Sequence, residues 1–322
     1  MFDLAGRRIW VTGHRGMVGS AVWRLLVARP DVEPIGWESS ELDLTDRAAT
    51  IDAAMQAQPD LVVMAAAKVG GIAANEAAPV EFLADNIRIQ TNVMEAAHLV
   101  DVDRLLFLGS SCIYPRLAPQ PIPASAMLTG PLEPTNDAYA IAKLAGVVHT
   151  QGYRREYGRR WISAMPTNLY GPGDSFDLEA SHVLPALIRR FDEAVQTGST
   201  TVTLWGTGTP RREFLHVDDA ASALVHLLER HDGPEPVNVG TGEDLPIAEL
   251  AALVAETVGF DGTIAWDTSR PDGTPRKLLD VSPLRTSGWR PTIGLADGIR
   301  STWAWYRNHV AEQSQRGRRG SG

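Results

Sequence analysis

Two side chains with complementary acid–base chemistry stand near each other in the segment DAYAIAKLAG. Tyr139 and Lys143 are four positions apart, and residues at this spacing share one face of a helix. A phenol has an ordinary pKa near 10, and a neighbouring ammonium group lowers it by stabilising the phenolate. The pair therefore favours proton relay. The plainer interpretation is an exposed pair on a helix surface.

A second group of reactive side chains follows the apolar segment 105–108. Ser110 and Cys112 come directly after this predicted strand, and open α/β sheets bind ligands where their parallel strands end. A serine hydroxyl can hydrogen-bond a substrate carbonyl, and a thiol can act as a base where nearby charge activates it. A lone cysteine is otherwise a small buried apolar residue.

Glycines 13, 16 and 19 form a G-x-x-G-x-x-G pattern between the apolar segment 9–12 and a helical pattern over 17–28. This spacing allows a tight turn and a close approach of the backbone to a pyrophosphate at the positive end of the helix. Arg15, inside the loop, is a candidate for binding an extra phosphate. The pattern therefore predicts a dinucleotide site, although glycines also serve ordinary turns.

Apolar segments and helical patterns alternate along the first half of the chain. Strands are expected at 9–12, 34–37, 61–66, 105–108 and 161–166. Helices are expected between them, at 17–28, 47–58, 84–100 and 139–157. Continuous apolar strands that alternate with helices indicate a doubly wound α/β fold, with a parallel sheet covered on both faces.

The pattern changes near residue 170, where the segment YGPGDSF begins, and this change predicts a smaller second domain. Further helices are expected at 182–195, 217–228, 247–258 and 295–306, and strands at 236–240 and before Trp205. We expect residues 1–170 to form the dinucleotide-binding domain, with 213–242 returning to it. Segments 171–212 and 243–310 would form the substrate domain. The tail 311–322 offers no apolar cluster and is expected to be disordered.

The composition excludes several classes of protein. A chain of 322 residues that is 44% hydrophobic and 21% charged is typical of globular proteins. Its formal net charge of −9 gives no general attraction to nucleic acids or anionic membranes, and no apolar segment has the length of a membrane span. The only cysteine, Cys112, cannot form an internal disulfide, and no Cys/His cluster has metal-binding spacing. We therefore expect a cytoplasmic protein without a metal.

Together these motifs resemble the extended short-chain dehydrogenase/reductases, which act mainly on nucleotide sugars. The strings GHRGMVGSA, FLGSSCIYP, EPTNDAYAIAKLAG, MPTNLYGP and PDGTPRKLLD are similar to the GDP-4-keto-6-deoxymannose epimerase-reductases, and the similarity extends over about residues 6–309. The resemblance implies a Rossmann fold, NADPH as cofactor, a homodimer in which helices such as 84–100 pair, and a two-stage reaction that forms GDP-L-fucose.

The resemblance also implies roles for the reactive residues. In the first stage Cys112 would act as base and His182 as acid, inverting the sugar at C3 and C5. In the second stage a nicotinamide hydride would reduce C4 while Tyr139 donates a proton. Lys143 would lower the pKa of Tyr139 and hold the ribose, and Ser110 would hold the ketone oxygen together with Tyr139. His182 could instead simply cap a helix.

Binding residues follow from the same resemblance. The cofactor would be bound by Gly13, His14, Arg15, Gly16, Met17, Val18, Gly19, Ser39, Asp43, Leu44, Leu108, Gly109, Ser110, Ser111, Tyr139, Lys143, Pro166, Thr167, Asn168, Leu169 and His182. The GDP-sugar would be bound by Arg190, Trp205, Arg212, Asp272 and Lys277. The guanidinium group of arginine can form two parallel hydrogen bonds with a phosphate group, and an aromatic ring can pack against the ligand. Without the resemblance, Arg190 would read as a solvated charge and Trp205 as a core residue.

One stretch departs from the family pattern. Relatives carry a basic residue near the end of the second strand that helps bind the 2′-phosphate of NADPH, whereas this chain has Trp37, Glu38, Ser39 and Ser40. An acidic residue here can instead accept a hydrogen bond from the free ribose 2′-hydroxyl of NADH. Because Arg15 is present and a serine can bond phosphate, NADPH is favoured and NADH is the alternative.

Two other functions remain as alternatives. An NAD-retaining nucleotide-sugar 4-epimerase or 4,6-dehydratase would share the fold, but dehydratases carry a carboxylic acid–base pair where this chain has Ser111 and Cys112. A non-catalytic dinucleotide-sensing scaffold would be expected to lose Tyr139, Lys143, Cys112 or His182. All four of these residues are present.

Overall fold

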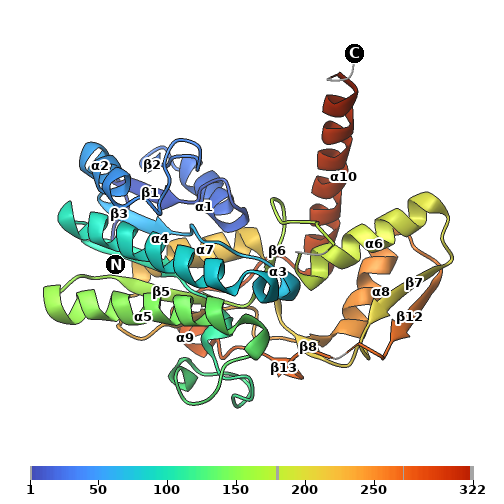
Figure 1. Cartoon of the computed structure of the whole chain (residues 1–322). Coiled ribbons are helices and arrows are strands. Elements are labelled where there is room, and N and C mark those ends of the chain that lie inside the picture. Colours follow the sequence, from blue (N-terminus) through green and yellow to red (C-terminus); the bar gives the residue numbers. More distant parts are fainter. Residues whose placement is uncertain (1, 179–180, 271, 320–322) are drawn as a thin grey trace.

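A six-stranded parallel sheet forms the larger part of the molecule. The computed structural model describes residues 2–178, 181–270 and 272–319. The strands of the sheet are β1 (Arg8–Thr12), β2 (Glu33–Ile35), β3 (Leu61–Met64), β4 (Arg104–Leu108), β5 (Ile162–Pro166) and β10 (Val237–Val239). Their order is β10-β5-β4-β3-β1-β2 (Figure 1). The order reverses between β1 and β3, and ligands of doubly wound folds bind outside the carboxyl ends of the strands at such a point.

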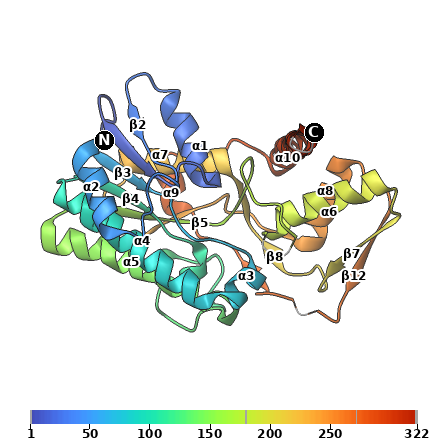
Figure 2. The ribbon, with the colours of Figure 1, turned by 45° about the horizontal axis from the view of Figure 1, so that its top comes forward.

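Helices cover both faces of this sheet. Helices α1 (Met17–Val27) and α7 (Val217–Arg230) pack together on one face, and α2 (Arg47–Ala57), α4 (Pro79–Leu99) and α5 (Asp137–Tyr157) cover the other (Figure 2). The side chains of β1 show how the two faces are filled: Ile9 and Val11 lie in the core under α1 and α7, while Trp10 lies in the opposite core. The doubly wound α/β fold expected from the sequence is therefore confirmed.

A smaller lobe with its own core lies beside the carboxyl edge of the sheet. It contains α6 (Val183–Thr197), α8 (Ile247–Val258) and the parallel pair β7 (Thr201–Trp205) and β12 (Thr263–Asp267). A three-stranded sheet joins β8 (Arg211–Arg212) to β11 (Leu245–Pro246) and β13 (Arg276–Lys277), and a separate pair joins β6 (Asn168–Tyr170) to β9 (Phe214–His216). These short strands and α3 (Ile72–Ala77) were not expected from the sequence, because strands this short are defined by their partners.

The last helix includes residues 311–319 of the tail that was expected to be disordered, and residues 320–322 lie outside the described residues. Helix α10 (Leu295–Arg319) continues past the predicted end at residue 306, and it extends away from the rest of the molecule (Figure 1). Extending an existing helix costs much less free energy than starting one, so a helix can continue through a polar segment. No helix in the described part of the chain is long and apolar enough to cross a membrane.

Candidate active site

The glycine loop between β1 and α1 leaves no room for side chains. Gly13 has a φ of +69°, and a Cβ on it would lie 2.8 Å from the Cα of Ala66. A Cβ on Gly19 would lie 2.1 Å from the carbonyl oxygen of Gly13. Helix α1 starts at Met17 with no side-chain cap and no acidic residue in its first turn, so its first N–H groups are open to an anion. The loop therefore fits the pyrophosphate of a dinucleotide.

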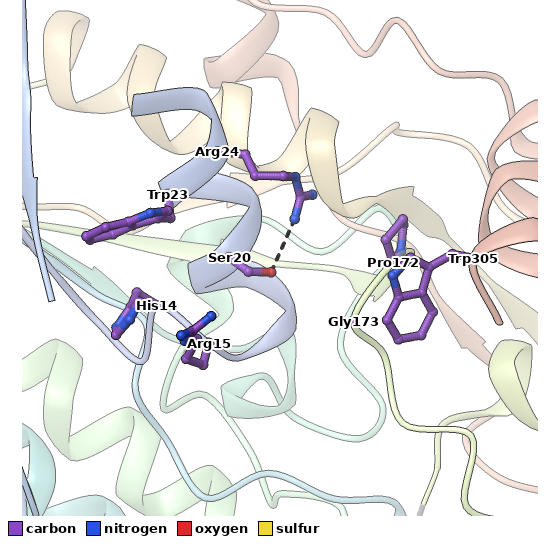
Figure 3. A pocket seen from close by; sticks show the side chains of 8 residues that line it. All are labelled: His14, Arg15, Ser20, Trp23, Arg24, Pro172, Gly173 and Trp305. Carbon is purple, nitrogen blue, oxygen red and sulfur yellow. Dashed lines mark hydrogen bonds between the residues drawn. The ribbon is translucent and has the colours of Figure 1, made fainter. Parts of the chain in front are cut away.

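A cavity of about 440 Å³ adjoins this loop (Figure 3). It is lined by His14, Arg15, Ser20, Trp23, Arg24, Pro172, Gly173 and Trp305. These residues come from the glycine loop and α1, from the loop after β6, and from α10. A Cβ on Gly173 would lie 3.4 Å from the Cα of Met17, so the loop after β6 passes close to the start of α1. The dinucleotide half of the molecule therefore meets the smaller lobe at the glycine loop.

The reactive serine and cysteine lie at the carboxyl end of β4. The Oγ atom of Ser110 accepts a hydrogen bond from the backbone N–H of Cys112 (3.3 Å) and caps the short 3₁₀-helix η1 (Ser111–Ile113). The side chain of Cys112 is buried, with 6% of the residue exposed. Burial raises the pKa of Cys112, while the charges of Lys277 and Lys143 and the hydrogen bond with Ser110 lower it. The thiol is therefore the favoured form.

Tyr139 and Lys143 both lie on α5 and face this strand end. The Nζ atom of Lys143 donates a hydrogen bond to the carbonyl oxygen of Leu108 (2.8 Å) and lies 5.8 Å from the ring centre of Tyr139. Lys143 is buried, and this burial lowers its pKa to about 8, against the opposing attraction of Cys112. Helix α5 and the segment that follows β4 thus bring four side chains together, those of Ser110, Cys112, Tyr139 and Lys143.

The pKa of Tyr139 differs from the expectation that Lys143 lowers it. Burial raises this pKa, and the charge of an ionised Cys112 raises it further, while the hydrogen bond with Ser110 lowers it. The reason is that the free-energy cost of removing a phenolate from water exceeds the stabilisation that the neighbouring groups provide. Tyr139 therefore keeps its proton near neutral pH and is suited to donate it.

His182 stands at the N-cap position of α6, but its side chain makes no capping hydrogen bond, so the plainer interpretation as a helix cap is wrong. Exclusion of water by the surrounding protein lowers the pKa of His182, and the charge of Lys277 lowers it further. Lys277 also lines a small cavity together with Cys112. One ammonium group therefore acts on both the cysteine and the histidine.

The residues expected to bind a GDP-sugar form two groups. Lys277 of β13 pairs in register with Arg212 of β8, and Asp272 attracts Arg212 electrostatically while accepting hydrogen bonds from Thr207. This first group adjoins Cys112. In the second group, the guanidinium of Arg190 lies 5.8 Å from the ring centre of Trp205.

Trp205 is 63% exposed, so it is not a core residue. A residue missed by the sequence analysis also belongs to this second group, because the guanidinium of Arg270 lies 5.1 Å from the ring centre of Trp205. Hydrogen bonds from Ser269 lower the pKa of the Asp267 carboxylate, and the charge of Arg270 also acts on this carboxylate and lowers its pKa further. The signal that could have found Arg270 is its place just before the segment PDGTPRKLLD.

The other residues expected to contact a dinucleotide lie along the carboxyl edge of the sheet. Pro166 ends β5, and Thr167 and Asn168 both donate side-chain hydrogen bonds to the carbonyl oxygen of Glu213 (3.3 and 2.8 Å). Asn168 and Leu169 belong to strand β6 rather than to a loop, because β6 pairs with β9. Beyond β2, the carboxylate of Asp43 accepts hydrogen bonds from the N–H and Oγ1 of Thr45.

The glycine loop and the strand ends agree with what comparison with known proteins shows. The profile of the NAD dependent epimerase/dehydratase family matches residues 9–240. The chain belongs to this family. It is 54% identical over 306 residues to GDP-L-fucose synthase 1 of Arabidopsis thaliana, covering 95% of each chain. It is 50% identical to the GDP-L-fucose synthase of Escherichia coli K12, covering 94% of this chain and 97% of the relative.

Solved structures share the fold over nearly the whole chain. A GDP-6-OMe-4-keto-L-xylo-heptose reductase of C. jejuni is 31% identical with a TM-score of 0.89, covering 96% of this chain and 99% of that one. A GDP-L-fucose synthetase of Naegleria fowleri bound to NADP is 27% identical with a TM-score of 0.87, and 97% of each chain is covered.

No group of His, Cys, Asp and Glu that could hold a metal occurs among the described residues.

Proposed function

We propose that this chain is a GDP-L-fucose synthase, which converts GDP-4-keto-6-deoxymannose to GDP-L-fucose by epimerisation at C3 and C5 and then reduction at C4. The observation that carries the proposal is the gathering of a thiol, a phenol and two lysines at the end of β4, where Cys112 adjoins both Lys143 and Lys277. Relatives that are 50–54% identical over nearly the whole chain bear this name.

Epimerisation needs a base and an acid on protons that the 4-keto group has made acidic. Cys112 as base and His182 as acid supply them, and Ser110 hydrogen-bonds the ketone oxygen where negative charge develops. Burial raises the pKa of Cys112, and desolvation together with the charge of Lys277 lowers that of His182, so the uncharged pair is favoured at rest. Lys277 stabilises the thiolate and destabilises the imidazolium, which ties the two protonation steps to one charge.

Reduction needs a proton donor at the same oxygen. Tyr139 keeps its proton because burial raises its pKa. The ammonium group of Lys143 lies beside Tyr139 and is positioned by its hydrogen bond to the carbonyl oxygen of Leu108. NADPH, when bound, supplies the hydride for C4. We assign it to the glycine loop 13–19, to Ser39, Asp43 and Leu44 beyond β2, and to the strand ends at 108–111 and 166–169. Tyr139, Lys143 and His182 complete this set. A solved structure of a GDP-L-fucose synthetase is bound to NADP.

Three further proposals concern the domains, the oligomeric state and the location of the protein. We assign residues 1–170 and 213–242 to cofactor binding and the segments 171–212 and 243–310 to the GDP-sugar. We also propose a homodimer through α4 and α5, which pack against each other and expose Ile87, Ile141 and Val148. A cytoplasmic location is supported by the single free cysteine, which fits a reducing compartment.

The proposed function is tested by following the absorbance of the reduced nicotinamide. Purified protein is mixed with GDP-4-keto-6-deoxymannose and either NADPH or NADH, and the product is identified. We expect consumption of reduced cofactor and formation of GDP-L-fucose. Turnover without net consumption would instead indicate a 4-epimerase that recycles its cofactor. No turnover would contradict the proposal and direct the search to related GDP-keto-sugars.

The pKa of Lys143 predicts the pH dependence of cofactor use. Because burial lowers it from 10.5 to about 8, the ammonium form is present below about pH 8 and is lost above it. We expect kcat/KM for NADPH, which reports the free enzyme, to fall as pH rises through about 8. The measurement uses sugar that is already epimerised, so that Cys112 does not contribute. A constant kcat/KM from pH 7 to 10 would contradict the assigned charge.

Arg270 is expected to contribute to binding of the diphosphate. It faces Trp205 beside Arg190, and two permanent cations on one ring suit a dianion. Replacing Arg270 by alanine should weaken GDP about tenfold and leave guanosine binding unchanged, as measured by calorimetry. Arg230→Ala is the matched control, because it removes the same charge from the exposed end of α7. Equal effects of the two variants on GDP affinity would contradict a role of Arg270 in binding the diphosphate.

A further inference from the structure

The turn after β2 places a glutamate beside the glycine loop. Glu38 stands three residues after Ile35, the last residue of β2. The backbone N–H of Glu38 donates to the carboxylate of Glu41 (2.8 Å), and the carbonyl oxygen of Glu38 accepts from the N–H groups of Glu41 and Leu42 (2.9 Å each). These bonds close a turn, so the position of the Glu38 backbone is fixed.

The chain leading into this turn lies directly against the glycine loop. A Cβ on Gly36 would lie 2.7 Å from Nδ1 of His14 and 3.1 Å from the ring of Trp23. This close approach brings Glu38 to Arg15. The Nε atom of Arg15 donates a hydrogen bond to Oε1 of Glu38 (2.9 Å), and Nη2 of Arg15 pairs with the same oxygen. The one arginine of the glycine loop is therefore engaged by a carboxylate.

The segment after β2 supplies no cation of its own to replace Arg15. The segment 36–46 contains no lysine or arginine. The next arginine, Arg47, is itself paired with Glu95, through an Nε–Oε2 bond of 2.6 Å. A 2′-phosphate that approaches this turn would thus have to share Arg15 with Glu38, or displace Glu38 from it.

The two cofactors make opposite demands on such a carboxylate. A phosphate monoester carries close to two negative charges and is repelled by Glu38. The free 2′-hydroxyl of NADH is a hydrogen-bond donor and is matched by an acceptor. The Arg15 and Glu38 side chains are 72% and 43% exposed, and breaking so exposed a pair costs less than about tenfold in binding. NADPH therefore still binds, but its affinity exceeds that of NADH by a smaller factor than it would without Glu38.

We propose that Glu38 is a specificity-determining residue that narrows the preference of this chain for NADPH over NADH. It does so by holding Arg15, by repelling the 2′-phosphate and by accepting a hydrogen bond from an unphosphorylated ribose. The inference rests on the proposed NADPH-dependent function, but it concerns only the adenosine end of the cofactor.

The test measures binding of the adenosine end of the cofactor alone, by titrating the protein with 2′,5′-ADP and with ADP. The variant Glu38→Gln keeps the size of the side chain and removes its charge. We expect it to bind 2′,5′-ADP about tenfold more tightly and to bind ADP no more tightly than the unmodified chain. In kinetic assays, the ratio of kcat/KM for NADPH to that for NADH should rise by a similar factor.

Two further variants separate this effect from a general change of charge. Glu33→Gln removes an exposed carboxylate that pairs with Arg8 (3.3 Å) at the opposite end of β2, and it should leave both affinities unchanged. Arg15→Ala should reduce the gain that Glu38→Gln brings, because Glu38→Gln then only relieves the repulsion between the carboxylate and the phosphate and no longer releases Arg15.

The inference is overturned if Glu38→Gln changes the ratio of the two affinities by less than twofold, or by no more than Glu33→Gln does. It is also overturned if the gain is undiminished without Arg15. Because the titrations need no GDP-sugar, failure of the sugar reaction with an intact effect of Glu38→Gln would contradict the proposed function alone. Failure of the unmodified chain to bind either nucleotide would contradict both.

Discussion

Replacing Cys112 by serine is expected to suppress epimerisation while the same chain still reduces a sugar that is already epimerised. A serine hydroxyl fills nearly the same space but ionises far less readily than a thiol, and loss of a general base typically costs about 10²- to 10⁴-fold in rate. The measurement is exchange of the C3 and C5 protons with deuterated water, followed by NMR in the absence of NADPH.

The reduction assay on pre-epimerised sugar serves as the internal control of this variant. Cys112 is buried beside Ser110 and Lys277, so a general disturbance of the site would lower both stages together. Equal loss of exchange and reduction would therefore show that Cys112 supports the structure of the site rather than acting as the base.

Replacing Tyr139 by phenylalanine should have the opposite effect on the two stages. The variant removes only the hydroxyl group, whose proton is retained near neutral pH because burial raises the pKa. We expect reduction to fall about 10²- to 10⁴-fold and proton exchange at C3 and C5 to continue at a lower rate, since Ser110 still holds the ketone oxygen. The measurement compares consumption of NADPH with proton exchange.

Tyr157→Phe is a matched control for this variant. Tyr157 is the last residue of the same helix α5, is 51% exposed and lies far along the helix from the strand end. Its hydroxyl should be dispensable for both stages. Consumption of NADPH by Tyr139→Phe at the rate of Tyr157→Phe would exclude Tyr139 as the proton donor.

Local sequence patterns predict the main elements and the types of reactive residue. The glycine loop, the strand before Ser110 and the helix that carries Tyr139 and Lys143 all depend on neighbours within a few positions, so periodicity and spacing were enough to find them. The strands of the large sheet were found for the same reason, since buried parallel strands are continuously apolar.

Contacts between distant segments were not predictable in this way. The pairing of β7 with β12, and of β8 with β13, joins residues more than fifty positions apart. Strands β8 and β13 have only two residues each and therefore no pattern of their own. The same holds for Arg270 beside Trp205 and for Glu38 beside Arg15. In each case the sequence supplied the residue, and its partner depended on the path of the chain.

The sequence by itself determined a doubly wound fold, a dinucleotide loop and the placing of a serine, a cysteine, a tyrosine and a lysine at one edge of a sheet. Only the tertiary structure decided their protonation states. Burial raises the pKa of Tyr139 where a neighbouring lysine alone would lower it, and Lys277 reaches Cys112 from a distant strand. The physical reason is that desolvation and charge depend on everything packed around a group, which no local pattern records.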